Sequence, residues 1–368
     1  MATQLSTHRQ RSRCTALLNC MIEGSDRNLR RALDILRTAH WFEHLLFTGS
    51  ARTAYALGKL IQPDTYRKNQ NADRFNHNLW PKYAVGKHVP SAAVLDRAEA
   101  VVQDSRSAFD HVLFDALDPT QNIGTRGNAL IRRTHPGVQH AIFEARPLMR
   151  GTFRRRSSWR RAASAVAAIG DLDAVAALVV MVREAAESND PKRAHALGEL
   201  LQRAFLIASL QIIAIVTGYE LGIALEFWVM RLTTYRGLRY RIDFIEDAKA
   251  AFHLRGVIGG LDDAAEIGPL EEDHARTAHL ILSGRWNEVL HFALAPVPVI
   301  ESECVDVPLE SRIKARQWEI RREWAWATLR SGKRAPFLPI ELINRLREAE
   351  RILKADAAAS HQRSDIKP

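Results

Sequence analysis

The chain has 368 residues, of which 46% are hydrophobic and 26% are charged, and its formal net charge at pH 7 is +10. This composition is typical of a globular protein, and it excludes both a wholly disordered chain and a polytopic membrane protein. The length favours two or three domains. The positive charge indicates an anionic partner and carries no information about the fold.

The N-terminal part of the chain is predicted to be helical. Leucines at helical spacing follow Ser25, a good N-cap, and this predicted helix ends at Gly49. Ser50 can cap a second helix over residues 51–61. Residues 64–78 are polar and rich in asparagine, so we expect a loop there.

The sequence WPKYAVGKHVPS at residues 80–91 resembles the end of the recognition helix and the following turn in Cro-type phage-repressor helix-turn-helix domains. Gly86 can adopt the left-handed conformation that ends a helix, and Pro90 separates that helix from the next. The resemblance covers about residues 50–102, and it departs from the family pattern at Pro81 and in the longer loop before it. A helical corner without a nucleic-acid role is the alternative. The resemblance implies that four side chains contact DNA: His77, Asn78, Lys82 and Lys87.

Most of the positive charge lies in residues 123–170, which hold ten arginines, no lysine and a single acid, Glu144. A guanidinium group matches phosphate oxygens with a planar set of donors, and Phe153 and Trp159 could supply faces on which bases stack. We therefore predict a nucleic-acid-binding surface. The alternatives are a solvated basic face and a segment that pairs with acidic residues. The predicted binding residues are Arg126, Arg132, Arg133, Arg146, Arg150, Arg154, Arg155, Arg156, Arg160 and Arg161.

The C-terminal half is predicted to be a succession of helices with few strand-like alternations. An extended segment is expected within residues 299–307, and a disordered polar tail over residues 357–368. The predicted helices span about residues 171–187, 192–217, 220–232, 238–254, 270–283, 286–294, 309–330 and 340–356.

Residues 204–219 carry no formal charge, so this is the segment to be considered as a membrane span. A span needs about 20 consecutive apolar residues, and Ser209, Gln211 and Thr217 make this run more polar. Glu220 follows directly, and burying its carboxylate in lipid would be unfavourable. We predict a central helix buried in protein, with membrane association as the alternative.

Motifs that carry chemistry are missing from the sequence. It has no Walker loop, dinucleotide-binding glycine pattern, nucleophile elbow or kinase signature. His40 and His44 have the spacing of a metal-binding pair without an indicated third ligand, and Asp171 has the position of a helix cap. We therefore predict no catalytic residue, no metal site and no cofactor. Three cysteines without a C-x-x-C motif indicate free thiols and a cytoplasmic location.

The sequence thus predicts a mainly α fold, a multi-helix bundle with an N-terminal helical module over residues 1–120. An arginine-rich connector over residues 121–162 would join it to a larger helical domain over residues 163–356. The predicted function is non-catalytic, regulatory binding of DNA or RNA. The alternatives are a helical scaffold whose basic segment docks an acidic protein, and a membrane-associated helical protein. An enzyme with scattered active-site residues is a further class.

Overall fold

The computed structural model describes residues 2–66, 79–210, 212–268, 271–301, 304, 306–332 and 338–364. These residues are mainly helical, and the one sheet among them has two strands, which confirms the predicted fold class. The chain divides into two compact units. The first unit combines Met1–Thr134 with Gln211–Trp228, and the second combines His135–Leu210 with Val229–Pro368.

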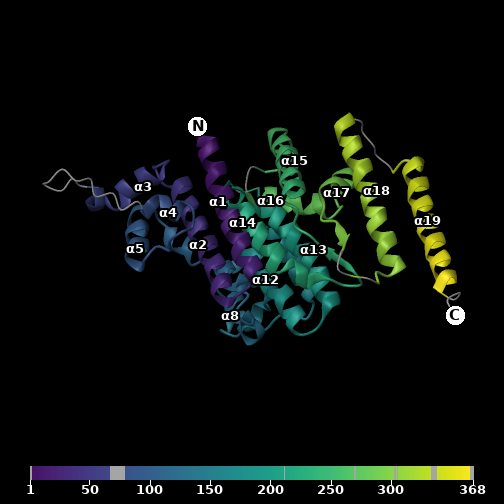
Figure 1. Ribbon diagram of the computed structural model, residues 1–368, viewed down its shortest axis with the longest axis horizontal. Coiled ribbons are helices and arrows are strands. Elements are labelled where there is room, and N and C mark those ends of the chain that lie inside the picture. The colour runs from purple at the N-terminus through teal and green to yellow at the C-terminus, as the bar shows by residue number, and fades with distance from the viewer. Residues whose placement is uncertain are drawn as a thin grey trace. The chain divides into compact units, whose positions relative to one another are not determined.

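Three long helices form the frame of the first unit: α1 (Ala2–Glu23), α2 (Asp26–Thr48) and α14 (Ile212–Trp228) (Figure 1). They pack against one another, and α2 also contacts several shorter helices. The Ser25 hydroxyl accepts a hydrogen bond from the backbone N–H of Asn28, which confirms the predicted start of α2. The shorter elements are α3 (Ala54–Ile61), η1 (Pro63–Tyr66), α4 (Leu79–Ala84), α5 (Ala92–Val101), α6 (Ser105–Phe109), α7 (Val112–Leu117), η2 (Gly124–Arg126) and α8 (Gly127–Ile131).

Aromatic side chains hold the shorter helices of the first unit against α2. Trp41 of α2 stacks on Trp80 of α4, with ring centroids 5.8 Å apart, and meets Tyr83 and Phe109 edge to face. All four rings are buried. The indole N–H of Trp80 donates a hydrogen bond to Gln62 at 3.0 Å, whereas the buried indole N–H of Trp41 has no hydrogen-bond partner among the described residues. This cluster fixes α4 and α6 on one face of α2.

The second unit is built around α12 (Leu172–Glu187), which is buried on nearly all sides. Its alanines and valines are small enough to let α11 (Trp159–Ile169) and α13 (Pro191–Ala208) approach closely. Asp171 caps α12, as predicted, because its carboxylate accepts a hydrogen bond from the backbone N–H of Ala174 at 2.7 Å.

The remaining elements of the second unit surround this helical centre. β1 (Leu238–Tyr240) and β2 (Pro298–Ile300) form an antiparallel pair in which Leu238 lies opposite Ile300. The long helix α18 (Leu309–Ser331) packs against β2 and against α19 (Ile340–Ser364). The other elements are α9 (Pro136–Ile142), α10 (Ala145–Met149), η3 (Met230–Thr233), α15 (Phe244–Asp263), α16 (Glu271–Leu282) and α17 (Glu288–Leu294).

Three helices predicted in the second half of the chain have other bounds in the structure. The predicted helices over residues 192–217 and 220–232 are divided at a different place, because α13 ends at Ala208 in the second unit, whereas α14 continues from Ile212 to Trp228 and packs on α1 and α2 in the first. The start of the predicted helix over residues 238–254 is the strand β1, because its backbone finds a distant partner in β2. The local helix and strand preferences of these residues carry no information about this pairing, since it joins residues about 60 positions apart.

Three further differences concern a helix cap, the end of a helix and one whole helix. Thr53, and not Ser50, caps α3, since the Thr53 hydroxyl accepts a hydrogen bond from Ala56. The predicted disordered tail over residues 357–368 is helical as far as Ser364. The helix α1 was not predicted at all. Most of the predicted loop over residues 64–78 lies outside the described residues, although residues 63–66 form η1.

The chain passes from one unit to the other three times, after residues 134, 210 and 228. The uncharged run over residues 204–219 is divided between α13 and α14. Within the described ranges, no helix has both the length and the apolar character required to cross a bilayer.

Candidate functional site

The arginines predicted to bind nucleic acid are divided between the two units. Arg126, Arg132 and Arg133 belong to the first unit, and all three are exposed. The other seven belong to the second unit, where Arg155 is half-buried and its companions are exposed. The ten side chains therefore do not form one continuous surface within either unit, and each group is considered by itself. The seven in the second unit are Arg146, Arg150, Arg154, Arg155, Arg156, Arg160 and Arg161.

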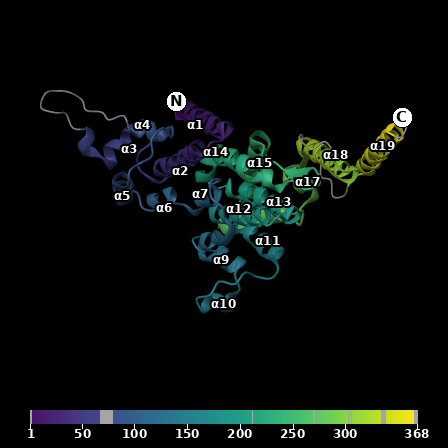
Figure 2. The same ribbon diagram turned by 60° about the horizontal axis from the view of Figure 1, so that its bottom comes forward.

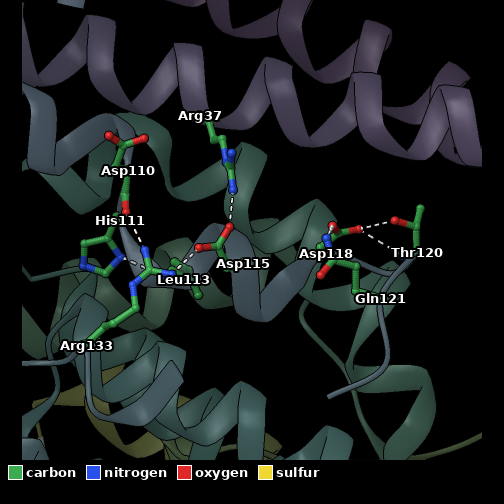
Figure 3. Close-up of polar contacts among 9 residues, drawn as sticks. All are labelled: Arg37, Asp110, His111, Leu113, Asp115, Asp118, Thr120, Gln121 and Arg133. Carbon is green, nitrogen blue, oxygen red and sulfur yellow. Dashed lines mark hydrogen bonds and ion pairs between the residues drawn. The ribbon is translucent and has the colours of Figure 1, made fainter. Parts of the chain in front are cut away.

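In the first unit, Arg133 is held by acidic and backbone oxygens. The carboxylate of Asp115 lies between Arg37 and Arg133 and pairs with both guanidinium groups (Figure 3). Arg133 also donates a hydrogen bond to the backbone oxygen of Asp110 at 3.1 Å. These contacts tie α2 and the segment after α8 to α7. Arg133 is thus occupied by structural partners.

The close-up also shows how both ends of α7 are fixed (Figure 3). At its start, the ring Nδ1 of His111 accepts a hydrogen bond from the backbone N–H of Leu113 at 3.1 Å. Beyond its end, the Asp118 carboxylate accepts hydrogen bonds from Thr120 and Gln121. Capping of this kind stabilises a short helix. We assign a structural role to these polar groups.

Residues 142–156 of the second unit form a hairpin, which we call the arginine hairpin. Two backbone hydrogen bonds of 2.9 Å close it, one from the N–H of Glu144 to Arg154 and the other from the N–H of Arg156 to Ile142. The ring of Phe153 meets the buried ring of Phe143 edge to face, with centroids 5.2 Å apart. The base of the hairpin is therefore anchored in the unit.

The short helix α10 forms the end of the arginine hairpin, and Figure 2 shows it beyond α9 and α11 on an extended loop. Gly151 turns the chain with a φ of +74°, which a residue with a Cβ rarely adopts. Both the backbone N–H and the hydroxyl of Thr152 donate hydrogen bonds of 2.7 Å to the carbonyl oxygen of Pro147. These bonds close the turn, so the hairpin end has a defined conformation.

The arginines of the hairpin differ in how strongly the protein holds them. Arg155 forms a two-pronged ion pair with Glu184 of α12, with N–O distances of 2.7 and 3.0 Å. Arg154 remains 78% exposed and lies 3.6 Å from Glu144, and Arg156 donates to the backbone oxygen of His140 at 2.8 Å. In the described part of the chain, the two exposed arginines at the hairpin end, at positions 146 and 150, form no ion pair.

The aromatic residue near the hairpin already has cationic neighbours. The guanidinium groups of Arg160 and Arg193 lie 5.3 and 5.4 Å from the centroid of the Trp159 ring. Such contacts stabilise the ring and the cations together. Trp159 is half-buried between these groups, and Phe153 packs on Phe143. Both rings predicted as stacking faces are thus engaged within the protein.

The segment that resembles a helix-turn-helix has the predicted turn. Gly86 has a φ of +67°, and the backbone N–H of Lys87 donates to Lys82 at 2.9 Å, which completes the end of α4. Ser91 occupies the N-cap of α5. The helix α4 has only six residues and turns its two aromatic side chains into the core. Lys82 is half-buried and Lys87 is exposed, while His77 and Asn78 lie outside the described residues.

A buried ionic network in the first unit was not predicted. Arg13 donates to Glu220 at 2.6 Å and to Glu43 at 2.7 Å, and also to the backbone oxygen of Ala84. The three charged side chains are 1%, 0% and 5% exposed, respectively. Burial raises the pKa of Glu220, and the Arg13 guanidinium opposes that rise. The network joins α1, α2 and α14 at the centre of the unit.

A second buried polar cluster lies along α13. Glu199 accepts hydrogen bonds from Arg203 at 2.6 Å and from the hydroxyl of Tyr240 at 3.1 Å. One turn away, Gln202 donates to the carboxylate of Asp247 at 3.1 Å. Burial raises the pKa of Asp247 to about 7. The members of this cluster bind one another, although Oε1 of Gln202 and Nε of Arg203 are buried without a hydrogen-bond partner in the described structure, and we assign the cluster a structural role.

The histidine pair on α2 is not arranged as a metal site. His40 is buried, its ring lies 3.3 Å from the hydroxyl of Thr217, and burial lowers its pKa to about 3. Burial also lowers the pKa of His44. Across the residues that the structure describes, no group of three or more His, Cys, Asp or Glu side chains is placed to hold a metal ion.

Two open grooves border α18. The one between α18 and α19 has a volume of about 710 Å³ and an apolar floor that includes Ile320 and Leu353. The other, between α15 and α18, has a volume of about 610 Å³ and includes His253 and Trp326. Both are lined by charged side chains of both signs. Neither groove concentrates positive charge as the arginine hairpin does.

The arginine hairpin is therefore the strongest candidate for an interaction site in the described residues. It presents cationic side chains on an anchored backbone, whereas the buried polar clusters consist of groups that already bind one another. Comparison of the sequence and the structure with known protein families, with characterised proteins and with solved structures finds no match.

Proposed function

We propose that this protein binds nucleic acid through the arginine hairpin. The observation that carries the proposal is the presence of exposed guanidinium groups on a hairpin that contains a single acid of its own, Glu144, while the one other acid paired with it, Glu184, is held by the half-buried Arg155. Arg146 and Arg150 lie at its end, and Arg154 and Arg156 lie on the segment by which the chain returns to its base. Guanidinium groups donate to phosphate oxygens in a planar geometry, and a cluster of them attracts a polyanion over several ångströms.

The number of available cations sets the expected salt dependence. Arg155 is committed to Glu184 and is not counted. The four other arginines of the hairpin would neutralise up to four phosphates, so the logarithm of the affinity for duplex DNA should fall with the logarithm of the salt concentration at a slope of about −4. Between 50 and 200 mM salt this slope corresponds to a loss of about 200-fold.

The test is fluorescence anisotropy of labelled DNA and RNA duplexes and single strands, titrated with the full chain across a salt series. Replacing Arg146, Arg150 and Arg154 with glutamine should make the slope less negative by about 3, because three phosphate contacts are lost. Binding that persists in this variant with an unchanged slope would contradict the proposal.

A matched control removes the same charge from elsewhere in the second unit. Arg255, Arg276 and Arg347 are exposed, and their replacement with glutamine lowers the net charge by the same three units. We expect this control to retain the slope of the unaltered protein. An equal loss in both triple variants would show that net charge, and not the hairpin, is responsible for binding.

The alternative is a scaffold that docks an acidic protein through the same hairpin. It predicts no measurable affinity for any duplex or single strand at 50 mM salt, together with retention of an acidic protein partner that the triple hairpin variant loses. A scaffold interface with an apolar centre would also depend less on salt than phosphate contacts do. The anisotropy series therefore separates the two functions.

A further inference from the structure

One apolar side chain of the arginine hairpin is unusual in its exposure. Met149 is 85% exposed, the highest value among the large hydrophobic residues of the described chain. A single exposed apolar residue is common on a protein surface. Met149, however, stands at the end of α10 between the two exposed arginines at positions 146 and 150. It is the outermost apolar group on the surface that we propose to meet nucleic acid.

The backbone beneath Met149 is held in place. The turn after it is closed by the two hydrogen bonds from Thr152 to Pro147, and the base of the hairpin by those of Glu144 and Arg156. Pro147 itself restricts the backbone of α10. The hairpin therefore presents Met149 from a preorganised backbone, so little backbone freedom is lost when the side chain enters a partner.

The geometry points to Met149 as a wedge that enters between adjacent base pairs of duplex DNA, with Arg146 and Arg150 on the phosphates on either side. This inference rests on the proposed function. Methionine is unbranched and polarizable, so it can fill a narrow, irregular gap between bases. Proteins that bend DNA insert apolar side chains of this kind between base steps while arginines contact the adjoining backbone.

Other occupants fit the hairpin end less well. Burying one methionine side chain in a lipid surface removes too little apolar area from water for stable attachment. A protein partner would need a wider apolar centre, and the neighbours Pro147 and Leu148 are already half-buried. A base step offers a slot for one side chain, flanked by two negative charges.

Insertion has a consequence for the choice of site. Separating two stacked base pairs is unfavourable, and its free-energy cost is lowest at pyrimidine–purine steps such as TA. The protein should therefore kink the duplex and favour sequences that contain such a step. Phosphate contacts alone would give neither property.

The experiment uses the full chain and a duplex carrying 2-aminopurine beside a central TA step, with donor and acceptor dyes at its ends. We expect binding to raise the 2-aminopurine emission and to shorten the distance between the dyes. Met149→Ala should abolish both signals while the affinity falls by less than about tenfold and the salt slope stays unchanged. Met149→Leu should retain both signals, since leucine can also act as a wedge.

The control is Phe252→Ala, which removes another strongly exposed apolar side chain of the second unit and should change nothing. Binding by the unaltered protein without a rise in emission would overturn the wedge and leave the proposed function standing. Retention of both signals in Met149→Ala would do the same. No binding of any duplex would overturn the inference, and no binding of any duplex or single strand would overturn the proposed function as well.

Discussion

Replacing Arg13 with methionine tests the buried ionic network of the first unit. The substitution keeps an unbranched side chain of similar length but leaves Glu43 and Glu220 in an apolar interior without their cation. Two unit charges 4 Å apart interact by about 4 kcal/mol at an effective dielectric constant of 20, and Arg13 has two such partners. Protonation of Glu220 limits the loss, so we expect the free energy of unfolding to fall by about 3–5 kcal/mol.

The effect of this substitution should depend on pH. Burial raises the pKa of Glu220 even with Arg13 present, and removing the guanidinium raises it further. An acid whose pKa is higher in the folded than in the unfolded state binds more protons when folded, so stability falls as the pH rises above the unfolded pKa of about 4.3. The loss caused by Arg13→Met should therefore be smaller at pH 5 than at pH 8.

Hydrogen exchange of peptides from α2, measured over a urea series, reports the stability of the first unit separately. The triple variant Arg13→Met, Glu43→Gln, Glu220→Gln removes all three charges and should recover most of the stability, since a neutral cluster carries no uncompensated charge. A loss below about 1 kcal/mol in the single variant, or one that does not change with pH, would refute the reasoning.

Two more predictions concern the second unit. Burial raises the pKa of Asp247 to about 7, so the free energy of unfolding should fall by on the order of 2–4 kcal/mol as the pH rises from 4 to 7 and this carboxyl group ionises. Asp247→Asn should remove most of this pH dependence, which urea unfolding at several pH values measures. Gly170 has a φ of +65°, and a Cβ there would lie 2.2 Å from the Cγ2 of Ile207. Gly170→Ala should therefore lower the free energy of unfolding by about 2–4 kcal/mol, whereas Gly151→Ala, which meets open space at a similar φ, should cost less. Equal losses at the two glycines would contradict the packing argument.

The parts of the fold that could be predicted are those fixed by local chemistry. The helix α2 begins at a serine cap and carries leucines at helical spacing, and α12 begins at the aspartate cap predicted for it. Gly86 has the left-handed conformation that its sequence context indicated. Each of these features depends on residues within one or two helical turns, so a single sequence contains the necessary information.

The parts that could not be predicted depend on distant residues. Leu238–Tyr240 has helical neighbours in sequence and becomes a strand only because Pro298–Ile300 pairs with it. The interruption after Ala208 carries neither glycine nor proline, and it follows from the two cores to which α13 and α14 belong.

The candidate site shows the same division between local and distant information. The sequence located the cluster of arginines but not the pairing of Arg155 with Glu184 or of Arg133 with Asp115. It also gave no sign that Arg13 is buried between two glutamates, because these three residues are far apart in the chain. Which cations remain available to a ligand is thus a property of the folded chain.

The place of α14 has a consequence for biosynthesis. The first unit needs residues 211–228, which the ribosome makes only after it has made 76 residues of the second unit, at positions 135–210. Until then α1 and α2 lack the helix that supplies Glu220, and their facing side chains stay open to water or to chaperones. A nascent chain arrested near residue 134 should accordingly be sensitive to protease, and protection should appear once residue 228 has left the exit tunnel. The first unit can therefore be completed only after a large part of the second unit has been synthesised.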